Sequence, residues 1–106
     1  NKTYIKPISF MKDYPFKNNE SSRRYELDLG DDTALIDYFK TDDGSIIALT
    51  HTEVPYQYEN QGIGSQLVEK SLNDIQEQGC KVIPSCGFVA AYIRRHPQWK
   101  ELVAER

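Results

Sequence analysis

Residues 54–65, V-P-Y-Q-Y-E-N-Q-G-I-G-S, decide how we interpret the rest of the chain. Pro55 cannot donate to a β-ladder, so it ends the apolar segment before it, and a polar loop then leads to Gly62-Ile63-Gly64. From residue 65 to about residue 78, apolar side chains recur at helical spacing: Val68, Leu72 and Ile75. The stretch therefore predicts a strand, a glycine-containing loop and an amphipathic helix, in that order.

Three segments before this loop have the pattern of β-strands. Residues 25–29 alternate apolar and acidic side chains, and residues 33–39 form a second apolar run. Residues 45–54 are the longest apolar and β-branched run, which predicts a central strand that is buried on both faces for part of its length. Residues 41–44 (T-D-D-G) have the composition of a short hairpin loop. We expect an antiparallel meander.

The segments after the helix complete a strand-helix-strand unit. Gly79 is a natural C-cap, and residues 81–83 predict a short buried strand that ends at Pro84. Such a crossover returns parallel to its first strand, so this last strand should lie parallel to residues 45–54. Residues 88–95 predict a short C-terminal helix that is closed by Pro97 and has one apolar face: Phe88, Ala91 and Tyr92.

Length and composition indicate one soluble globular domain. The chain has 106 residues, of which 39% are hydrophobic and 27% charged. Its net charge of −3 provides no general attraction for nucleic acid or acidic lipid, and no apolar run approaches the roughly 18–20 residues of a membrane span. We expect a cytoplasmic protein with no nucleic-acid or membrane partner. Residues 1–22 lack a sustained period and predict a loosely packed N-terminal arm before a domain of residues 23–106.

The glycine loop and its flanks resemble motif A of the GNAT superfamily of acetyl-CoA-dependent N-acyltransferases. The family pattern R/Q-x-x-G-x-G/A falls on residues 59–64, E-N-Q-G-I-G, where Glu59 replaces the usual Arg or Gln. Together with R-R-Y-E-L, L-T-H-T-E-V-P and P-S-C-G-F-V-A-A-Y-I-R-R-H-P, the pattern is similar to the small single-domain, yjdJ-type subgroup over residues 23–103.

This resemblance implies an α/β (α+β) class and a minimal GNAT-like fold. That fold has an antiparallel meander, one parallel strand joined by the motif-A helix, and a short C-terminal helix. The chain departs from larger members, because we find no counterpart of the first strand and the paired helices that build their acceptor side.

The resemblance also implies acetyl-CoA as co-substrate, with its diphosphate on the backbone amides of residues 61–65. The residues themselves agree, because two glycines allow close approach and a helix N-terminus favours an anion. A purely structural turn explains the glycines equally well, and the Walker pattern is absent. The candidate cofactor-binding residues are Val54, Asn60, Gln61, Gly62, Ile63, Gly64 and Ser65.

Cys86 is a candidate nucleophile, since it follows the last strand where a bound thioester would end. It could carry the acetyl group as a protein thioester if the start of the next helix lowers its pKa. The alternative is a half-buried, unreactive thiol. Cys80 lies at the other end of the same strand, some 20 Å away if the strand is extended, which is too far for a disulfide. We interpret Cys80 as structural.

Three further side chains are candidates for proton transfer. His51 and Glu53 are two residues apart on one strand and so share a face, from which either could take a proton from an amine. A hydrogen-bonded core histidine and a solvated edge carboxylate are the alternatives. Tyr92 follows Ser85 by seven residues, similar to the GNAT N-x-x-A-x-x-x-Y spacing. In that family such a tyrosine protonates the departing CoA thiolate, and the alternative is a core tyrosine.

These observations lead to two functional hypotheses. The first is an N-acetyltransferase-like acyltransferase that passes an acetyl group from acetyl-CoA to an unknown amine acceptor, either a small molecule or a protein, with Cys86 as the candidate carrier. The second is a non-catalytic module that binds or senses acetyl-CoA. No pair of Cys or His residues has metal-ligand spacing, so we expect no metal.

Overall fold

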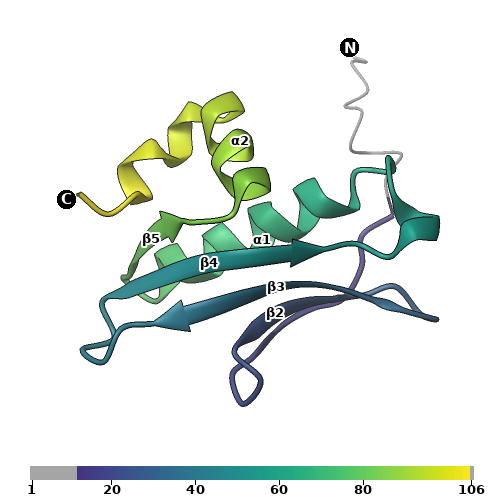
Figure 1. The fold of residues 1–106 in the computed structure, drawn as a ribbon, viewed down its shortest axis with the longest axis horizontal. Helices are drawn as coiled ribbons and strands as arrows, with labels where there is room; N and C mark the ends of the chain where they lie inside the picture. Colours follow the sequence, from purple (N-terminus) through teal and green to yellow (C-terminus); the bar gives the residue numbers. More distant parts are fainter. Residues whose placement is uncertain (1–11, 106) are drawn as a thin grey trace, which may run out of the picture.

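The computed structural model describes residues 12–105 (Figure 1). Its elements, in chain order, are β1 (Phe16–Asn19), β2 (Arg24–Asp28), β3 (Thr33–Lys40), β4 (Ile46–Glu53), η2 (Tyr56–Tyr58), α1 (Ile63–Glu77), β5 (Lys81–Pro84), α2 (Gly87–Arg95) and η3 (Pro97–Leu102). The predicted strands and both predicted helices are confirmed, with boundaries shifted by one or two residues.

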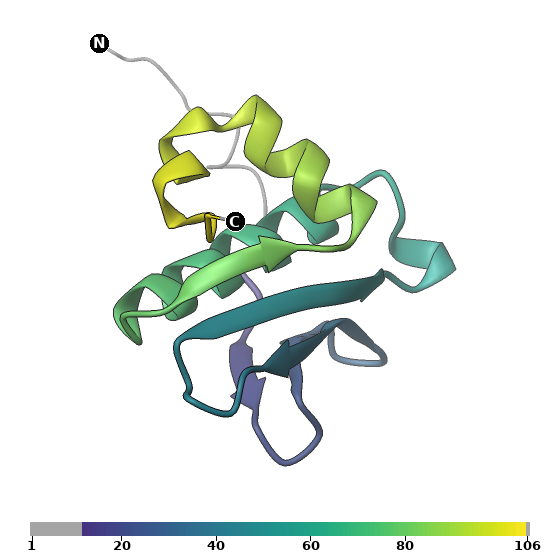
Figure 2. The ribbon, with the colours of Figure 1, turned by 60° about the vertical axis from the view of Figure 1, so that its left-hand side comes forward.

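The five strands form one mixed sheet in the order β1-β2-β3-β4-β5. The first four strands pair antiparallel, and β5 pairs parallel to β4 from Ile46↔Lys81 to Leu49↔Pro84. Figure 2 shows β5 beside β4, with the crossover helix α1 behind both strands. The meander, the parallel strand and the minimal α+β architecture are therefore as predicted.

The interpretation of residues 1–22 as a loose arm is wrong for residues 12–22. β1 pairs with β2 through a tight turn at residues 20–23, and Tyr14 and Phe16 pack against the core. β1 reads F-K-N-N, so it has no alternating apolar pattern and its place in the sheet depends on backbone pairing. The first strand that we expected to be missing is thus present, whereas no helix lies between β1 and β2. The rest of the predicted arm, residues 1–11, lies outside the described residues.

The core lies between the sheet and α1. Alternate residues of β2 and β3 are buried, as are five apolar side chains of α1, and these groups belong to one cluster: Tyr25, Leu27, Ala34, Ile36, Tyr38, Ile63, Leu67, Val68, Leu72 and Ile75. Each large apolar side chain buried in this way contributes about 1.5–3 kcal/mol. Gly79 ends α1 with a positive φ of 75°, as a C-cap requires.

A β-bulge interrupts β4 and changes which side chains point to the core. Tyr38 of β3 pairs with Leu49 and Asp37 pairs with His51, so Thr50 is an extra residue on β4. One extra residue reverses the alternation along a strand. Before the bulge, Ile47 and Leu49 face the core. After it, Thr52 points to the core side, while His51 and Glu53 face outward.

The prediction that β4 is buried on both faces is wrong. Ile47 and Leu49 are fully buried, but Ile46 and Ala48 on the other face are only partly buried. The reason is that the buried side chains of both helices join the cluster on the Ile47 and Leu49 face. The outer face of the sheet is left partly exposed.

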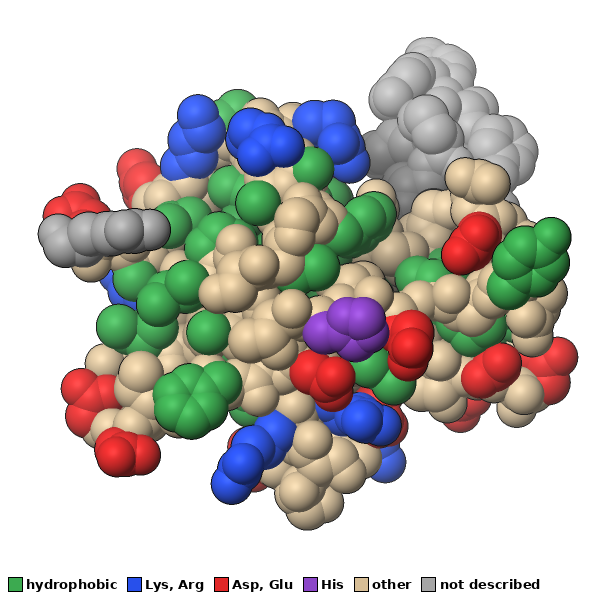
Figure 3. Space-filling model, viewed as in Figure 1, with side chains coloured by type: hydrophobic (Ala, Val, Ile, Leu, Met, Phe, Trp, Pro, Cys, Tyr) green, Lys and Arg blue, Asp and Glu red, His purple; other side chains and the backbone are tan. Residues whose placement is uncertain are grey.

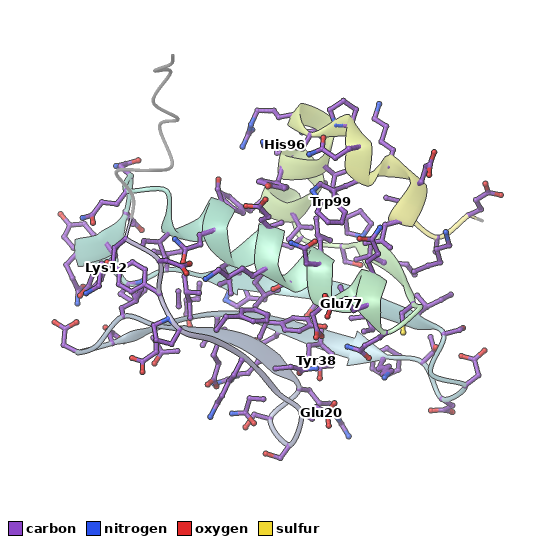
Figure 4. All side chains as sticks on the ribbon, turned by 180° about the vertical axis from the view of Figure 1, so that it is seen from behind. Lys12, Glu20, Tyr38, Glu77, His96 and Trp99 are labelled. Carbon is purple, nitrogen blue, oxygen red and sulfur yellow. The ribbon has the colours of Figure 1, made fainter. Side chains whose placement is uncertain are left out.

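The C-terminal segment covers the edge of the sheet next to β5. α2 buries Val89, Tyr92 and Ile93, whereas Phe88 is 41% exposed. The predicted apolar face is therefore right in including Tyr92 and wrong in including Phe88. Trp99 of η3 is buried, and Figure 4 shows it near His96 at the end of α2. The backbone N–H of Ala104 then donates to the carbonyl of Val82, at 2.8 Å.

Candidate functional site

A cleft with a volume of about 400 Å³ opens where the end of β4, the loop after it and the first turns of α1 and α2 meet. Its walls come from residues far apart in the sequence: Thr52, Val54, Tyr58, Glu59, Asn60, Gly62, Ile63, Gly64, Ser65 and Phe88. Six of the seven predicted cofactor-binding residues therefore lie in one cleft. The exception is Gln61, whose side-chain nitrogen donates to the carbonyl of Gln57 instead, at 3.2 Å.

The two glycines of the loop are required for different reasons. Gly62 has a φ of 80°, in the left-handed region that favours glycine. Gly64 has no unusual φ, but a Cβ on it would lie 2.7 Å from Cζ of the Phe88 ring. The first glycine thus permits a tight turn and the second permits contact between α1 and α2. Both explanations are structural, and neither requires a ligand in the cleft.

The N-terminus of α1 forms part of the wall of the cleft. The backbone N–H groups of Ile63, Gly64 and Ser65 belong to the first turn of the helix, where no intrahelical acceptor is available. Gly62 provides no side-chain cap, and all four residues line the cleft. Unpaired amides at the positive end of a 15-residue helix make this part of the cleft suited to an anion.

A tyrosine fixes the loop that forms another wall. The Tyr58 hydroxyl donates to the carboxylate of Asp31, at 2.6 Å, and approaches the carbonyl of Leu29, at 3.3 Å. The hydrogen bond to Asp31 raises the pKa of Tyr58 to about 12. The loop after β4 is thus connected to the turn after β2, so the cleft wall does not depend on local sequence alone.

Cys86 lies next to the cleft, at the N-cap of α2. Its backbone N–H donates to the carbonyl of Leu49, at 3.0 Å, and its Sγ lies 3.3 Å from Oγ1 of Thr52. Burial by itself raises the pKa of this thiol. The Thr52 hydroxyl and the backbone N–H groups of Phe88 and Val89 outweigh that effect, so the pKa of Cys86 is lowered overall.

Thr52 is a site residue that the sequence analysis missed. It lines the cleft and contacts Cys86, which is 34 residues later in the chain. Simple alternation along β4 assigns residue 52 to the face opposite Leu49. The extra residue Thr50 reverses this assignment, and an isolated sequence gives no clear signal of such a bulge.

His51 and Glu53 do share a face, as predicted, with His51 Nε2 and Glu53 Oε2 3.8 Å apart. That face is the outer one, opposite Thr52, and the two side chains are 59% and 67% exposed. Figure 3 shows a histidine side chain beside acidic side chains on the front of the molecule. Neither residue lines the cleft, so the structure does not bring them together with Thr52.

Tyr92 and Cys80 lie away from the cleft. Tyr92 is 4% exposed and stacks on the His96 ring, with the centroids 4.0 Å apart, and burial is the main cause that raises its pKa. Cys80 is also buried, and its thiol donates to the carbonyl of Gly44, at 3.1 Å. Both cysteines are free thiols. Neither Tyr92 nor Cys80 is among the residues that line the cleft.

The described part of the chain has neither a metal-binding cluster nor a membrane-spanning helix. Residues 12–105 contain no group of three or more His, Cys, Asp or Glu side chains arranged to hold a metal ion. No helix in this range is long and apolar enough to cross a membrane.

Comparison with known proteins agrees with this geometry. Residues 24–102 match the family described as GCN5-related N-acetyl-transferase, which covers every cleft residue and Cys86. Protein NATD1 of Gallus gallus is 33% identical over 52 residues, 49% of this chain and 47% of that protein. Protein NATD1 of Homo sapiens is also 33% identical over 52 residues, 46% of its length, so the chain spans about half the length of the curated relatives it matches. Because the family match extends over well more than half of the sequence, this chain belongs to the GCN5-related N-acetyltransferase family.

Proposed function

We propose that this protein binds acetyl-CoA in the cleft and transfers the acetyl group to an amine by way of Cys86. One observation carries the proposal. A cysteine of lowered pKa contacts Thr52, and Thr52 lines the same cleft as the N-terminus of α1. An anion site in the cleft and an activated thiol beside it match the diphosphate and the thioester of one ligand.

Binding would depend mainly on backbone groups. The amides of Ile63, Gly64 and Ser65 would receive the diphosphate, as expected of a helix N-terminus. Glu59 also lines the cleft, where the family pattern has Arg or Gln, and its carboxylate would repel a phosphate. The affinity should therefore be sensitive to salt and to the charge at residue 59.

The first chemical step is transfer to the protein. The Cys86 thiolate attacks the thioester carbonyl carbon of acetyl-CoA, so a carbon–sulfur bond to Cys86 forms while the bond to the CoA sulfur breaks. CoA leaves as a thiolate, and the charge is unchanged. One thioester replaces another, so the step is close to balanced in free energy. The lowered pKa increases the fraction of Cys86 that is ready to react at neutral pH.

The second step is attack by the acceptor amine. A neutral amine adds to the acetylated Cys86, an amide forms, Cys86 leaves as a thiolate and the amine gives up a proton. The β4–β5 pairing ends at Leu49↔Pro84, just before the contact between Thr52 and Cys86. His51 and Glu53 are exposed on the outer face of β4, and we propose them as acceptors of the proton from an amine that approaches from that face.

A non-catalytic acetyl-CoA-binding module is the second candidate. The observation that favours it is the short turn at residues 20–23, which joins β1 directly to β2. Larger members of the family, as the resemblance implies, build their acceptor side from paired helices near this position. The described residues contain no such helices, and this is what favours a module that binds acetyl-CoA without an acceptor.

Intact-protein mass spectrometry after incubation with acetyl-CoA tests the proposal, with Cys86→Ser and Cys80→Ser as matched variants. We expect one acetyl adduct in the wild type and in Cys80→Ser, removed by hydroxylamine, and none in Cys86→Ser. Calorimetric titration of acetyl-CoA runs in parallel. Binding without an adduct would favour the binding module, and the absence of binding would overturn both candidates.

A further inference from the structure

We infer that Thr52 is a positioning residue that holds the Cys86 thiolate beside the cleft through its hydroxyl group. This inference rests on the proposed function of Cys86 as the acetyl carrier. Thr52 itself touches no reacting carbon in this scheme, and it acts only through the sulfur of Cys86.

The contact is built by the backbone on both sides. Thr52 is β-branched and lies in a strand, where its χ1 angle is restricted, so β4 determines where its hydroxyl points. The Cys86 backbone N–H donates to the carbonyl of Leu49, at 3.0 Å, and its Sγ meets Thr52 Oγ1 at 3.3 Å. Cys86 is thus attached to β4 on both sides of the bulge at Thr50, once by its backbone and once by its sulfur.

The bulge is what makes the contact possible. If Thr50 took a regular place in the ladder, the side chain at 52 would point to the outer face and His51 would point toward Cys86. A histidine beside a cysteine would make a different kind of site, in which the imidazole takes the thiol proton. Here a hydroxyl takes that place. A hydroxyl does not accept the thiol proton as an imidazole does, but it stabilises the thiolate by donating a hydrogen bond to the sulfur.

The groups around Cys86 show how the Thr52 hydroxyl affects the pKa of the thiol. Burial of Cys86 favours the neutral thiol, and among the groups that oppose burial the Thr52 hydroxyl is the largest. The amides of Val89 and Phe88 at the start of α2 also lower the pKa of Cys86, as does the backbone of Thr52. Removing the hydroxyl alone should therefore shift the thiol toward its neutral form, while the helix start remains in place.

The test is the pH profile of Cys86 alkylation by iodoacetamide, measured in a Cys80→Ser background so that one thiol remains. Thr52→Val keeps the shape of the side chain and removes the hydroxyl, and Thr52→Ser restores it. We expect the midpoint of the profile to rise by about one pH unit in Thr52→Val, since loss of one charge-assisted hydrogen bond is of that order. In Thr52→Ser it should return close to the wild-type value.

The outcomes separate this inference from the proposed function. An unchanged midpoint in Thr52→Val, or a raised midpoint in Thr52→Ser as well, would show that Thr52 only packs and would overturn the inference. Circular dichroism confirms that each variant is folded, and Thr52→Ala provides the same comparison if the valine variant is not. No acetyl-CoA is used, so the proposed function can fail in the adduct experiment while the effect of Thr52 on Cys86 is still measured.

Discussion

Gly64 and Phe88 are in contact because Gly64 has no side chain. A Cβ at Gly64 would lie 2.7 Å from Cζ and 2.9 Å from Cε2 of the Phe88 ring, closer than real Cβ atoms come to other atoms. Gly64 is in the first turn of α1 and Phe88 in the first turn of α2, and both line the cleft. The second glycine of the motif thus determines where an aromatic wall of the cleft stands.

Gly64→Ala should move the Phe88 ring and thereby change the cleft. The ring is 41% exposed, so it can swing away, and alanine is the better helix former by about 1 kcal/mol. We therefore expect a change in the free energy of unfolding within about 1 kcal/mol, but at least tenfold weaker binding of acetyl-CoA. Urea unfolding and calorimetric titration measure the two quantities.

Gly87→Ala is the matched control for this prediction. Gly87 begins α2, and a Cβ there meets no atom within 4 Å, so the substitution should leave acetyl-CoA affinity unchanged. The double variant Gly64→Ala/Phe88→Ala removes the steric conflict and should bind no worse than Phe88→Ala alone. Equal affinity of Gly64→Ala and the wild type would contradict the predicted role of this contact.

A partly buried polar network joins the sheet to α1, and we predict that its members differ in their effect on stability. The Tyr25 hydroxyl donates to the carboxylate of Asp74, at 2.8 Å, and Gln78 donates to the same oxygen at 2.7 Å. Tyr25→Phe removes only the donor and should cost about 0.5–1.5 kcal/mol, whereas Asp74→Ala leaves a buried hydroxyl without its acceptor and should cost about 1–3 kcal/mol. Urea unfolding of the two variants decides whether this order holds. Tyr38, labelled in Figure 4, lies beside Tyr25, with the ring centroids 5.0 Å apart, and its hydroxyl donates to the side chain of Asn18, at 2.7 Å.

The same network predicts how stability depends on high pH. Burial, followed by the hydrogen bond to Asp74, raises the pKa of Tyr25 well above 10.0. In the unfolded chain Tyr25 ionises near pH 10, while in the folded chain it stays neutral, so its contribution is complete below pH 10 and is lost as the pH rises above it. Between pH 10 and 11 the wild type should lose about 1 kcal/mol more than Tyr25→Phe. Equal losses would mean that Tyr25 ionises as easily in the folded state.

Gln66 is predicted to hold the described N-terminal residues against α1. Its side-chain oxygen accepts from the Tyr14 backbone N–H and its side-chain nitrogen donates to the Lys12 carbonyl, both at 2.9 Å. Figure 4 shows Lys12 near the start of α1. Gln66→Leu keeps the volume but leaves these backbone groups unpaired, so it should cost about 1–3 kcal/mol and speed hydrogen exchange at Tyr14.

Lys70→Met provides the comparison. The Lys70 ammonium donates to the Tyr14 carbonyl, at 2.9 Å, and pairs with Asp13, but the Lys70 side chain is 26% exposed and the Asp13 side chain 84% exposed. Exposed pairs contribute about 0–1 kcal/mol, so this variant should be destabilised less than Gln66→Leu. The reverse order in urea unfolding would show that the ion pair, not the buried amide, holds residues 12–14.

Several elements could be predicted because their residues report on local structure. The alternation at Tyr25 and Leu27, the helical spacing from Val68 to Ile75 and the C-cap at Gly79 each reflect a backbone conformation and the burial of one face. The same is true of the crossover, since a strand, a helix and a second strand can connect in parallel in only one common way. β1 was not predicted because it is held in the sheet by backbone hydrogen bonds, and backbone groups are the same in every sequence.

The same distinction between local and long-range structure applies to the site. By itself the sequence determined the glycine loop, the helix start and the position of Cys86 at the next N-cap, because each depends on neighbours within a few residues. It also determined that His51 and Glu53 share a face. Only the tertiary structure decided which face that is, since the bulge at Thr50 is defined by pairing with Asp37 and Tyr38 of another strand. One extra residue in a two-residue period exchanges the two faces, and that exchange put Thr52 against Cys86.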